Sequence, residues 1–216
     1  MNATIAYNSK LIFDFDGVIF NNPKVNQKII EKSIGYVKSK TGYSYEKALD
    51  FNNVTSQNHG HSVLLLKHYG FEASLQEYNR YVFDNDTLAH LRNNISNDDY
   101  IRVECVKTAN NLIGNNSILF CNAPHAWCYK VLDLLDYNID ELFSIIYSGI
   151  GESSLKPNTI LYRVIECSNE NVDELHFFHN LVDGKKLSDK WIMHYVNSNI
   201  RLDNYVQPIV DEIVRR

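Results

Sequence analysis

Two aspartates stand one residue apart in the stretch FDFDGVIF, residues 13 to 20, directly after a short apolar run. In an extended strand residues i and i+2 point to the same side, so we expect Asp14 and Asp16 to project together from the carboxyl end of that strand. Two carboxylates held this close repel each other unless a bound cation, a shared proton or a nucleophilic reaction uses the pair. The spacing therefore indicates a metal site or a catalytic pair.

The segments around this pair differ in their periodicity. KLIFDF is typical of a buried strand that ends at the turn signal Asp-Gly. From Pro23 to about residue 97 the sequence predicts helices and no strand: Pro23 suits the first turn of a helix, Ser74 and Glu77 have capping-box spacing, and Gly70 suits a helix end. We therefore expect a helical insert of some seventy residues.

After residue 97 helices and strands alternate. The strands are expected at SILFC, FSIIYS, ELHFF and WIMHYV, and the helices between them at PHAWCYKVLDLLDY and PNTILYRVIECS. This alternation predicts a parallel sheet covered by helices on both faces, and such sheets bind ligands at the carboxyl ends of their strands. Cys121 and Asn122 end one predicted strand and His179 and Asn180 end another, so these residues should gather near Asp14.

The composition narrows the class of function. The 216 residues are 44% hydrophobic, which is enough to form a packed core. A formal net charge of −5 and the lack of a basic run argue against a nucleic-acid binder and favour a small ligand. No apolar stretch approaches the ~20 residues that span a bilayer, and the first residues lack a leader pattern, so we expect a cytoplasmic protein without a membrane segment. The four cysteines show no CxxC spacing, so neither a zinc site nor a redox pair is indicated.

The order of the motifs resembles that of the haloacid dehalogenase-like (HAD) superfamily of hydrolases over nearly the whole chain. FDFDGV matches the first motif, LFCNAP resembles the second, SLKPN matches the lysine-proline third motif, and HFFHNLVDG occupies the fourth. Within the superfamily the chain is most similar to pyrimidine 5′-nucleotidase-like members. The resemblance implies an α/β fold, with a Rossmann-like parallel-sheet core formed by residues 1–20 and 96–216 and an inserted all-helical cap formed by residues 21–95.

The resemblance also implies a reaction and roles for three residues. Asp14 would attack phosphorus, giving an aspartyl phosphate that water then hydrolyses. Asp16 would protonate the leaving alcohol and later deprotonate the water. Lys156 would neutralise the charge of the phosphate and of Asp14. The implied function is hydrolysis of a small phosphorylated metabolite, with nucleoside monophosphates as one candidate class.

Phosphate and metal ligands follow from the same resemblance. Cys121 and Asn122 would bind the phosphate together with Lys156. Mg²⁺ would be held by Asp14, by the backbone carbonyl of Asp16, and by Asp183.

Two positions depart from the superfamily pattern. The second motif normally presents threonine or serine, whereas Cys121 is a weaker hydrogen-bond donor. The fourth motif normally supplies one or two aspartates to the metal, whereas His179 and Asn180 stand in those places and Asp183 is the nearest acid. The metal site is therefore expected to be weaker than in members that carry an aspartate pair.

Two alternatives stay open. Asn180 and Asp183 reproduce the SNxxD spacing of metal-independent L-2-haloacid dehalogenases, in which an aspartate attacks carbon, but the retained Asp16 favours phosphate chemistry. The other alternative is a catalytically impaired HAD-fold protein that binds a ligand without turnover. Outside the motifs, His59 and His61 are interpreted as part of a loop that closes over substrate, and Trp127 as a core aromatic.

Overall fold

A parallel sheet forms the centre of the computed structural model, which describes residues 8–58, 60–114, 117–149, 151–180, 188–197 and 199–216. Within these residues the sheet has five strands in the order β3-β2-β1-β4-β5, and every neighbouring pair is parallel. The strands are β1 (Ser9–Phe13), β2 (Ser117–Phe120), β3 (Phe143–Tyr147), β4 (Glu174–His179) and β5 (Trp191–Tyr195). The predicted parallel α/β sheet is confirmed, with β1 as its central strand.

The register aligns the carboxyl ends of the three middle strands. Phe13, the last residue of β1, pairs with Leu119 of β2 and with Phe178 of β4. One residue later, the backbone N–H of Asp14 donates to the carbonyl of Phe178 at 2.9 Å. The residues that follow β1, β2 and β4 therefore meet at one edge of the sheet, as the alternating sequence pattern predicts.

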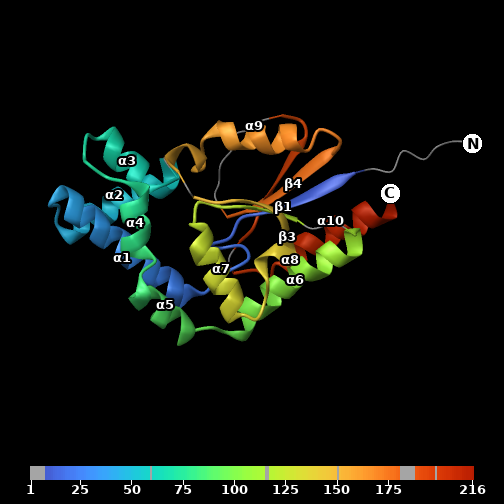
Figure 1. Cartoon of the computed structure of the whole chain (residues 1–216), viewed down its shortest axis with the longest axis horizontal. Helices are drawn as coiled ribbons and strands as arrows, with labels where there is room; N and C mark the ends of the chain where they lie inside the picture. Colours follow the sequence, from blue (N-terminus) through green and yellow to red (C-terminus); the bar gives the residue numbers. More distant parts are fainter. Residues whose placement is uncertain (1–7, 59, 115–116, 150, 181–187, 198) are drawn as a thin grey trace, which may run out of the picture.

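Successive residues of the central strands pack against opposite layers of helices. Leu11 and Phe13 belong to a core cluster that includes residues of α6 (Asn97–Ile113), α7 (His125–Leu134), α8 (Ile139–Leu142) and α10 (Asp203–Arg215). Ile12 belongs to a second cluster, whose helical members come from α9 (Thr159–Ser168). Figure 1 shows α9 on one side of the sheet and α6, α8 and α10 on the other. Both faces are covered, which explains the continuous apolar strand sequences.

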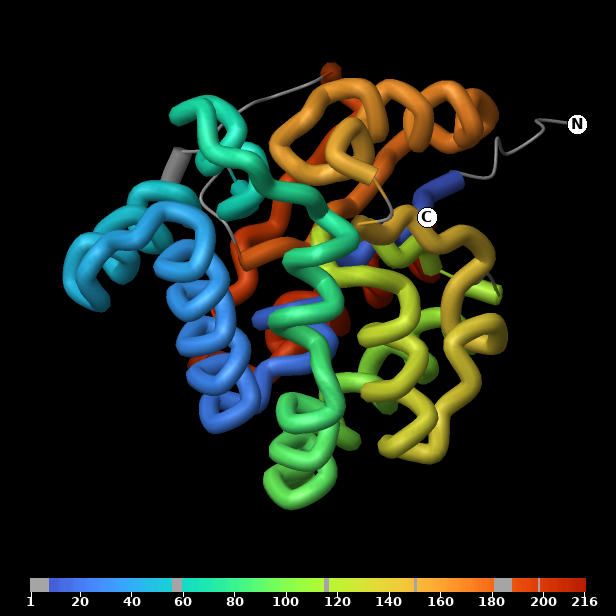
Figure 2. Tube along the Cα trace, turned by 60° about the vertical axis from the view of Figure 1, so that its left-hand side comes forward, coloured from blue at the N-terminus to red at the C-terminus, as the bar shows by residue number. Residues whose placement is uncertain are grey.

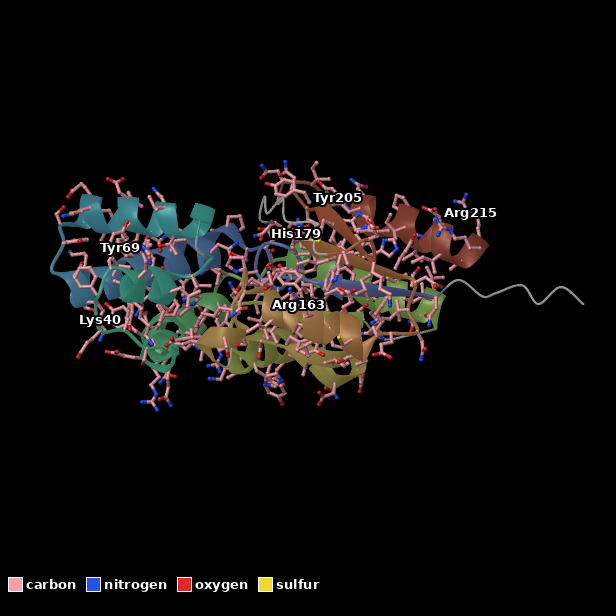
Figure 3. The ribbon with its side chains drawn as sticks, turned by 90° about the horizontal axis from the view of Figure 1, so that it is seen from above. Lys40, Tyr69, Arg163, His179, Tyr205 and Arg215 are labelled. Atoms are coloured by element: carbon pink, nitrogen blue, oxygen red, sulfur yellow. The ribbon has the colours of Figure 1, made fainter. Side chains whose placement is uncertain are left out.

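The remaining helices lie beyond one end of the sheet. They are α1 (Pro23–Thr41), α2 (Tyr45–Asn58), α3 (Ser62–His68), α4 (Leu75–Val82) and α5 (Asn85–Arg92). The first four of these helices surround a third cluster of buried apolar residues, which comprises Ile34, Tyr36, Val37, Ala48, Val63, Leu66, Tyr78 and Val82. Figure 2 shows α1 and α2 to the left of the sheet and α4 and α5 passing in front of it, and Figure 3 places Lys40 and Tyr69 at the opposite end of the molecule from Arg215.

Local capping explains where several helices begin. Asn22 accepts a hydrogen bond from the backbone N–H of Val25 at 3.2 Å at the start of α1. Ser74 accepts one from Glu77 at 3.1 Å, so the predicted cap of α4 is confirmed. The prediction that α9 begins at Pro157 was wrong by two residues, because Asn158 is the capping residue and the helix begins at Thr159. Between residues 23 and 97 the described chain forms helices and no strand, as expected.

A short connection that contains one 3₁₀ helix joins β3 to α9. The 3₁₀ helix η1 (Glu152–Ser154) follows β3 and precedes Lys156.

Among the described residues, no helix combines the length and the apolar character that crossing a bilayer requires.

Candidate active site

Asp14 and Lys156 form a buried ion pair at the carboxyl edge of the sheet. The Nζ atom of Lys156 lies 2.5 Å from Oδ2 of Asp14, and the two residues are only 4% and 6% exposed. Nζ also donates to the carbonyl of Phe120 at 3.2 Å, and Oδ1 of Asp14 accepts from the backbone N–H of Phe15 at 2.9 Å. Burying two charges is costly unless they are paired and hydrogen-bonded, and both conditions are met here.

Asn122 holds the loop that carries Lys156. Its Oδ1 accepts from the backbone N–H of Lys156 at 2.7 Å, and its Nδ2 donates to the carbonyl of the same residue at 3.1 Å. Nδ2 also lies 3.2 Å from the carbonyl of Gly60, in the loop between α2 and α3. Asn122, which the sequence predicts as a phosphate ligand, therefore holds the backbone segments of Lys156 and Gly60 in place beside the ion pair. Contact between Asn122 and phosphate stays a prediction.

Cys121 faces the core layer in this structure. Its side chain is buried, with Sγ 3.6 Å from the carbonyl of Ala123 and 3.7 Å from Sγ of Cys128. Its backbone N–H donates to the carbonyl of Tyr147 at 2.9 Å and extends the pairing of β2 with β3. The role of the Cys121 thiol in phosphate binding also stays a prediction.

Asp16 lies beside the ion pair in a different environment. Its Oδ1 accepts a hydrogen bond from Nε1 of Trp127 at 3.3 Å. Although part of the residue is accessible, surrounding protein raises the pKa of the Asp16 carboxyl to about 7, chiefly by burial and next by the charge of Asp14, while the Trp127 hydrogen bond and Lys156 act in the opposite direction. Among the described residues Asp14 forms an ion pair and Asp16 forms none, so the two carboxyl groups lie in different electrostatic environments.

The turn after Asp16 brings in the end of β4. Nδ2 of Asn180 donates to the backbone carbonyl of Asp16 at 3.1 Å. Gly17 has a φ of +82°, and a Cβ at this position would lie 2.0 Å from Nδ2 of Asn180. Only glycine allows both the turn and this close approach. His179 is buried with its ring stacked on Phe177 at a centroid distance of 5.1 Å.

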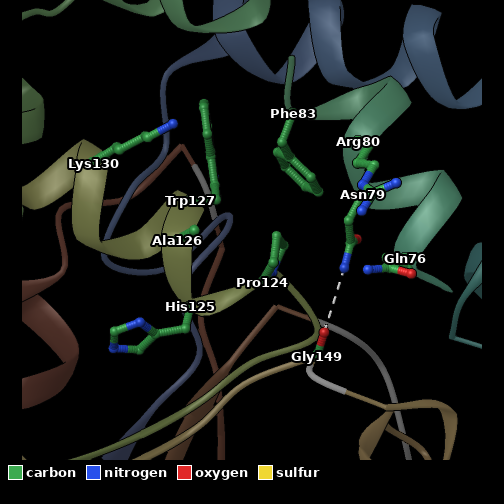
Figure 4. Close-up of a pocket in the computed structure, with 10 residues that line it drawn as sticks. All are labelled: Gln76, Asn79, Arg80, Phe83, Pro124, His125, Ala126, Trp127, Lys130 and Gly149. Atoms are coloured by element: carbon green, nitrogen blue, oxygen red, sulfur yellow. Dashed lines mark hydrogen bonds between the residues drawn. The ribbon is translucent and has the colours of Figure 1, made fainter. Parts of the chain in front are cut away.

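Within the described part of the chain, two pockets adjoin these residues. One of about 340 Å³ opens beside Asp16 and Asn180 and is walled by the start of α1. The other, of about 370 Å³, lies between α4 and α7 and is lined by Phe83 and Trp127 among others. Figure 4 shows this second pocket, including the hydrogen bond from Asn79 to the carbonyl of Gly149.

Contacts from the helical region reach the strand ends beside Lys156. Lys67 of α3 forms an ion pair with Glu152 of η1 at 2.6 Å. Gly60 has a φ of +69°, and a Cβ there would lie 2.3 Å from the carbonyl of Lys156. The neighbouring His61 is buried and accepts from the backbone N–H of Val63, and burial lowers its pKa to about 4. The backbone of the loop that contains Gly60 therefore packs directly against the backbone segment that contains Lys156.

The predicted site residues are brought together to different extents. The structure brings Asp14, Asp16, Lys156 and Asn122 together at the carboxyl edge of the sheet, next to the buried ion pair. The thiol of Cys121 lies against that of Cys128. The predicted metal ligand Asp183 and the loop histidine His59 lie outside the described residues. Within the described part of the chain, no three histidine, cysteine or acidic side chains cluster as a ready-made metal site.

Sequence reasoning missed the hydrogen bond between Trp127 and Asp16. Trp127 is indeed a core aromatic, at 2% exposed, but its polar edge serves the site. Its place in the first turn of the helix that follows the second motif is the one sequence signal that could have pointed to it.

Comparison with solved structures identifies the fold. No protein-family model matches the chain, and no curated protein has a detectably similar sequence. The crystal structure of CbbY from Rhodobacter sphaeroides in complex with phosphate is similar, with a TM-score of 0.54, 10% identity, and coverage of 93% of this chain and 83% of that one. A CbbY variant in complex with xylulose-(1,5)bisphosphate has a TM-score of 0.50 and 11% identity, and the match covers 80% of this chain and 77% of that one.

A HAD phosphatase from Thermococcus onnurineus matches with a TM-score of 0.48 and 12% identity over 88% of this chain and 94% of that one. The parallel sheet of this chain and its similarity to the CbbY structure identify its fold as the HAD-like α/β fold.

Proposed function

We propose that this protein hydrolyses phosphomonoesters through an aspartyl-phosphate intermediate. The observation that carries the proposal is the buried pair of Asp14 and Lys156, with the differently placed carboxyl of Asp16 beside it. A lysine that neutralises a nucleophilic carboxylate also favours the approach of a phosphate dianion. The HAD-like fold and the phosphate ligand of the similar CbbY structure support the same conclusion.

The chemistry follows from the positions of these side chains. A carboxylate oxygen of Asp14 attacks phosphorus while the bond to the leaving oxygen breaks, and Asp16 gives its proton to that oxygen. In the second step Asp16 takes a proton from water, which attacks the aspartyl phosphate and regenerates Asp14. The raised pKa of Asp16 suits a group that must alternate between protonated and ionised forms near neutral pH.

The oxygen atoms around Asp14 fit a hard divalent cation such as Mg²⁺. The described residues offer a carboxylate of Asp14 and the backbone carbonyl of Asp16, and the amide of Asn180 donates from its nitrogen to that carbonyl. Mg²⁺ prefers oxygen ligands and keeps several waters, so this small set is sufficient for weak binding. Asp183 is proposed as a further ligand. When bound, the cation would offset negative charge on the phosphate.

We also propose that residues 21–95 act as a cap over a core formed by residues 1–20 and 96–216. The separate apolar cluster of α1 to α4 supports this division. Leu88 and Leu91 of α5 pack in the same cluster as Phe13, so α5 lies at the junction of the two parts. The contacts of Gly60 and Lys67 with the strand-end loops would then belong to a closed arrangement that excludes water from the phosphate.

The experiment is phosphate release from a panel of phosphomonoesters with Mg²⁺, comparing wild type with Asp14→Asn. The panel includes nucleoside monophosphates because the sequence resembles pyrimidine 5′-nucleotidase-like proteins. We expect Asp14→Asn to lower turnover by on the order of 10³-fold or more, because the amide keeps the shape of the side chain but is a poor nucleophile.

The matched control is Asp173→Asn, which changes an exposed carboxylate at the other end of β4 and should leave turnover unchanged. Retention of most activity by Asp14→Asn would contradict the mechanism. Release of halide from 2-haloacids, with no phosphate release from any ester, would instead identify the chain as a dehalogenase.

A further inference from the structure

Trp127 is held in place by aromatic contacts from two parts of the chain. Its ring lies 6.3 Å from that of Phe20 in an edge-to-face arrangement and 5.1 Å from that of Phe83. Phe20 follows the turn after β1, and Phe83 follows the last residue of α4. Figure 4 shows Trp127 and Phe83 next to each other among the residues that line the pocket between α4 and α7. With the indole 2% exposed, these contacts leave its N–H a narrow range of directions.

The indole N–H points at one oxygen of Asp16 only. Nε1 donates to Oδ1 at 3.3 Å, and the amide of Asn180 bonds the backbone carbonyl of Asp16 at 3.1 Å. Within the described part of the chain, Oδ2 of Asp16 accepts no hydrogen bond. The carboxyl group is thus fixed by one oxygen while the other is left for a ligand.

We propose that Trp127 is a positioning residue, whose N–H holds Oδ1 of Asp16 and so directs Oδ2 at the bridging oxygen of a bound phosphomonoester. This inference rests on the proposed function. As the Asp14–phosphorus bond forms and the phosphorus–oxygen bond of the ester breaks, the proton on Oδ2 passes to the leaving oxygen, and the alcohol departs neutral. A carboxyl that rotates freely about its Cβ–Cγ bond spends less time in this orientation, so the hydrogen bond increases the productive fraction.

The chain offers a matched control in its other tryptophan. Trp191 in β5 is 3% exposed, and its Nε1 donates to Oε2 of Glu166 in α9 at 3.2 Å. The same substitution at this position removes the same hydrogen-bond donor to a carboxylate, but away from Asp16. The effect of losing an indole N–H in the core can therefore be separated from the effect on the general acid.

The first test compares kcat/KM for p-nitrophenyl phosphate, whose leaving group needs no proton, with kcat/KM for an alkyl phosphate, whose leaving group does. We expect Trp127→Phe to lower the value for the alkyl ester by up to about tenfold, because a single hydrogen bond to the neutral carboxyl group has an effect of this size, and to leave the value for the aryl ester nearly unchanged. Trp191→Phe should not alter the ratio of the two values. Equal losses on both esters, or no loss on either, would overturn the inference.

The second test does not depend on turnover. In wild type and Asp16→Ala, the indole N–H resonances are recorded by NMR and assigned with Trp191→Phe. We expect the Trp127 resonance to move upfield when its acceptor is removed and the Trp191 resonance to stay. An unmoved Trp127 resonance would overturn the inference. If the wild-type chain hydrolyses neither ester, the general-acid role falls with the proposed function, and the NMR comparison alone decides whether Trp127 orients Asp16.

Discussion

The two flanks of the Asp14 and Asp16 pair are built differently. On the β2 flank a lysine pairs with Asp14 at 2.5 Å, and Asn122 clamps the backbone of that lysine with two hydrogen bonds. On the β4 flank a neutral amide, that of Asn180, contacts the carbonyl of Asp16. One flank thus presents a fixed positive charge at Asp14, and the other presents the side-chain amide of Asn180 at the carbonyl of Asp16.

This difference separates two requirements of phosphate chemistry. In the proposed reaction, neutralising the nucleophile and the phosphate requires positive charge near Asp14, and Lys156 is placed to supply part of it. Holding a divalent ion requires several oxygen ligands, and each carboxylate lost weakens the attraction without forbidding binding. We therefore expect substitutions on the β2 flank to lower stability and turnover strongly. On the β4 flank we expect an added carboxylate to increase the affinity for Mg²⁺.

The largest effect should come from Lys156→Met, which removes the ion pair with Asp14 on the β2 flank. The substitution leaves the buried carboxylate of Asp14 without its partner, so we expect a loss of roughly 3–5 kcal/mol in the free energy of unfolding and loss of turnover. Denaturant unfolding measures the first quantity and phosphate release the second. The matched control is Lys67→Met, which removes the exposed ion pair with Glu152 and should cost at most about 1 kcal/mol. Equal costs for the two variants would contradict the importance of burial.

The next largest effect is a loss of stability at acidic pH, which we attribute to His61 in the loop beside Asn122. Burial lowers the pKa of His61 to about 4, below the ordinary 6.5, so the unfolded chain binds a proton between these values and the folded chain does not. The stabilising contribution is complete above about pH 6.5 and declines as the pH falls toward 4, by up to about 3 kcal/mol. His61→Asn keeps an acceptor for the cap of α3 and should flatten this decline, measured as the free energy of unfolding against pH.

His68→Asn, which replaces an exposed histidine at the end of the same helix, is the control for the pH series. An unchanged pH slope in His61→Asn would show that His61 does not carry the acid sensitivity.

The smallest effect should come from improving the β4 flank with Asn180→Asp. A carboxylate at this position adds a negative charge beside Asp16, so we expect the affinity for Mg²⁺ to rise roughly tenfold, measured by calorimetric titration. Asp183→Ala should weaken the affinity in the same titration. If neither substitution changed it, the metal would not bind at the carboxyl end of β1.

Much of the fold follows from local sequence signals. The strands appear as apolar runs, and the cap of α4 follows from the spacing of Ser74 and Glu77, because these signals depend on a few neighbouring residues. The meeting of Asp14 with Lys156 could be predicted only from the order of the motifs, since the two residues are far apart in the chain and join through the topology of the sheet.

The details of the site could not be read from the sequence. The clamp from Asn122 to Lys156 and the hydrogen bond from Trp127 to Asp16 depend on how a helix and a loop are oriented against β1, to within the length of a hydrogen bond. A buried tryptophan has the same sequence signature whether its N–H faces Asp16, as with Trp127, or Glu166, as with Trp191. Side-chain direction is set by tertiary packing, which periodicity does not encode.

In the proposed reaction the phosphoryl group is transferred to Asp14. This claim is tested most directly by quenching wild type with acid during steady-state turnover of a phosphomonoester and locating the phosphoryl group by tandem mass spectrometry of the digested protein. We predict a phosphoryl group on Asp14 in wild type and none in Asp14→Asn. A phosphoryl group on another residue, or none on a wild-type protein that turns over the ester, would contradict the claim.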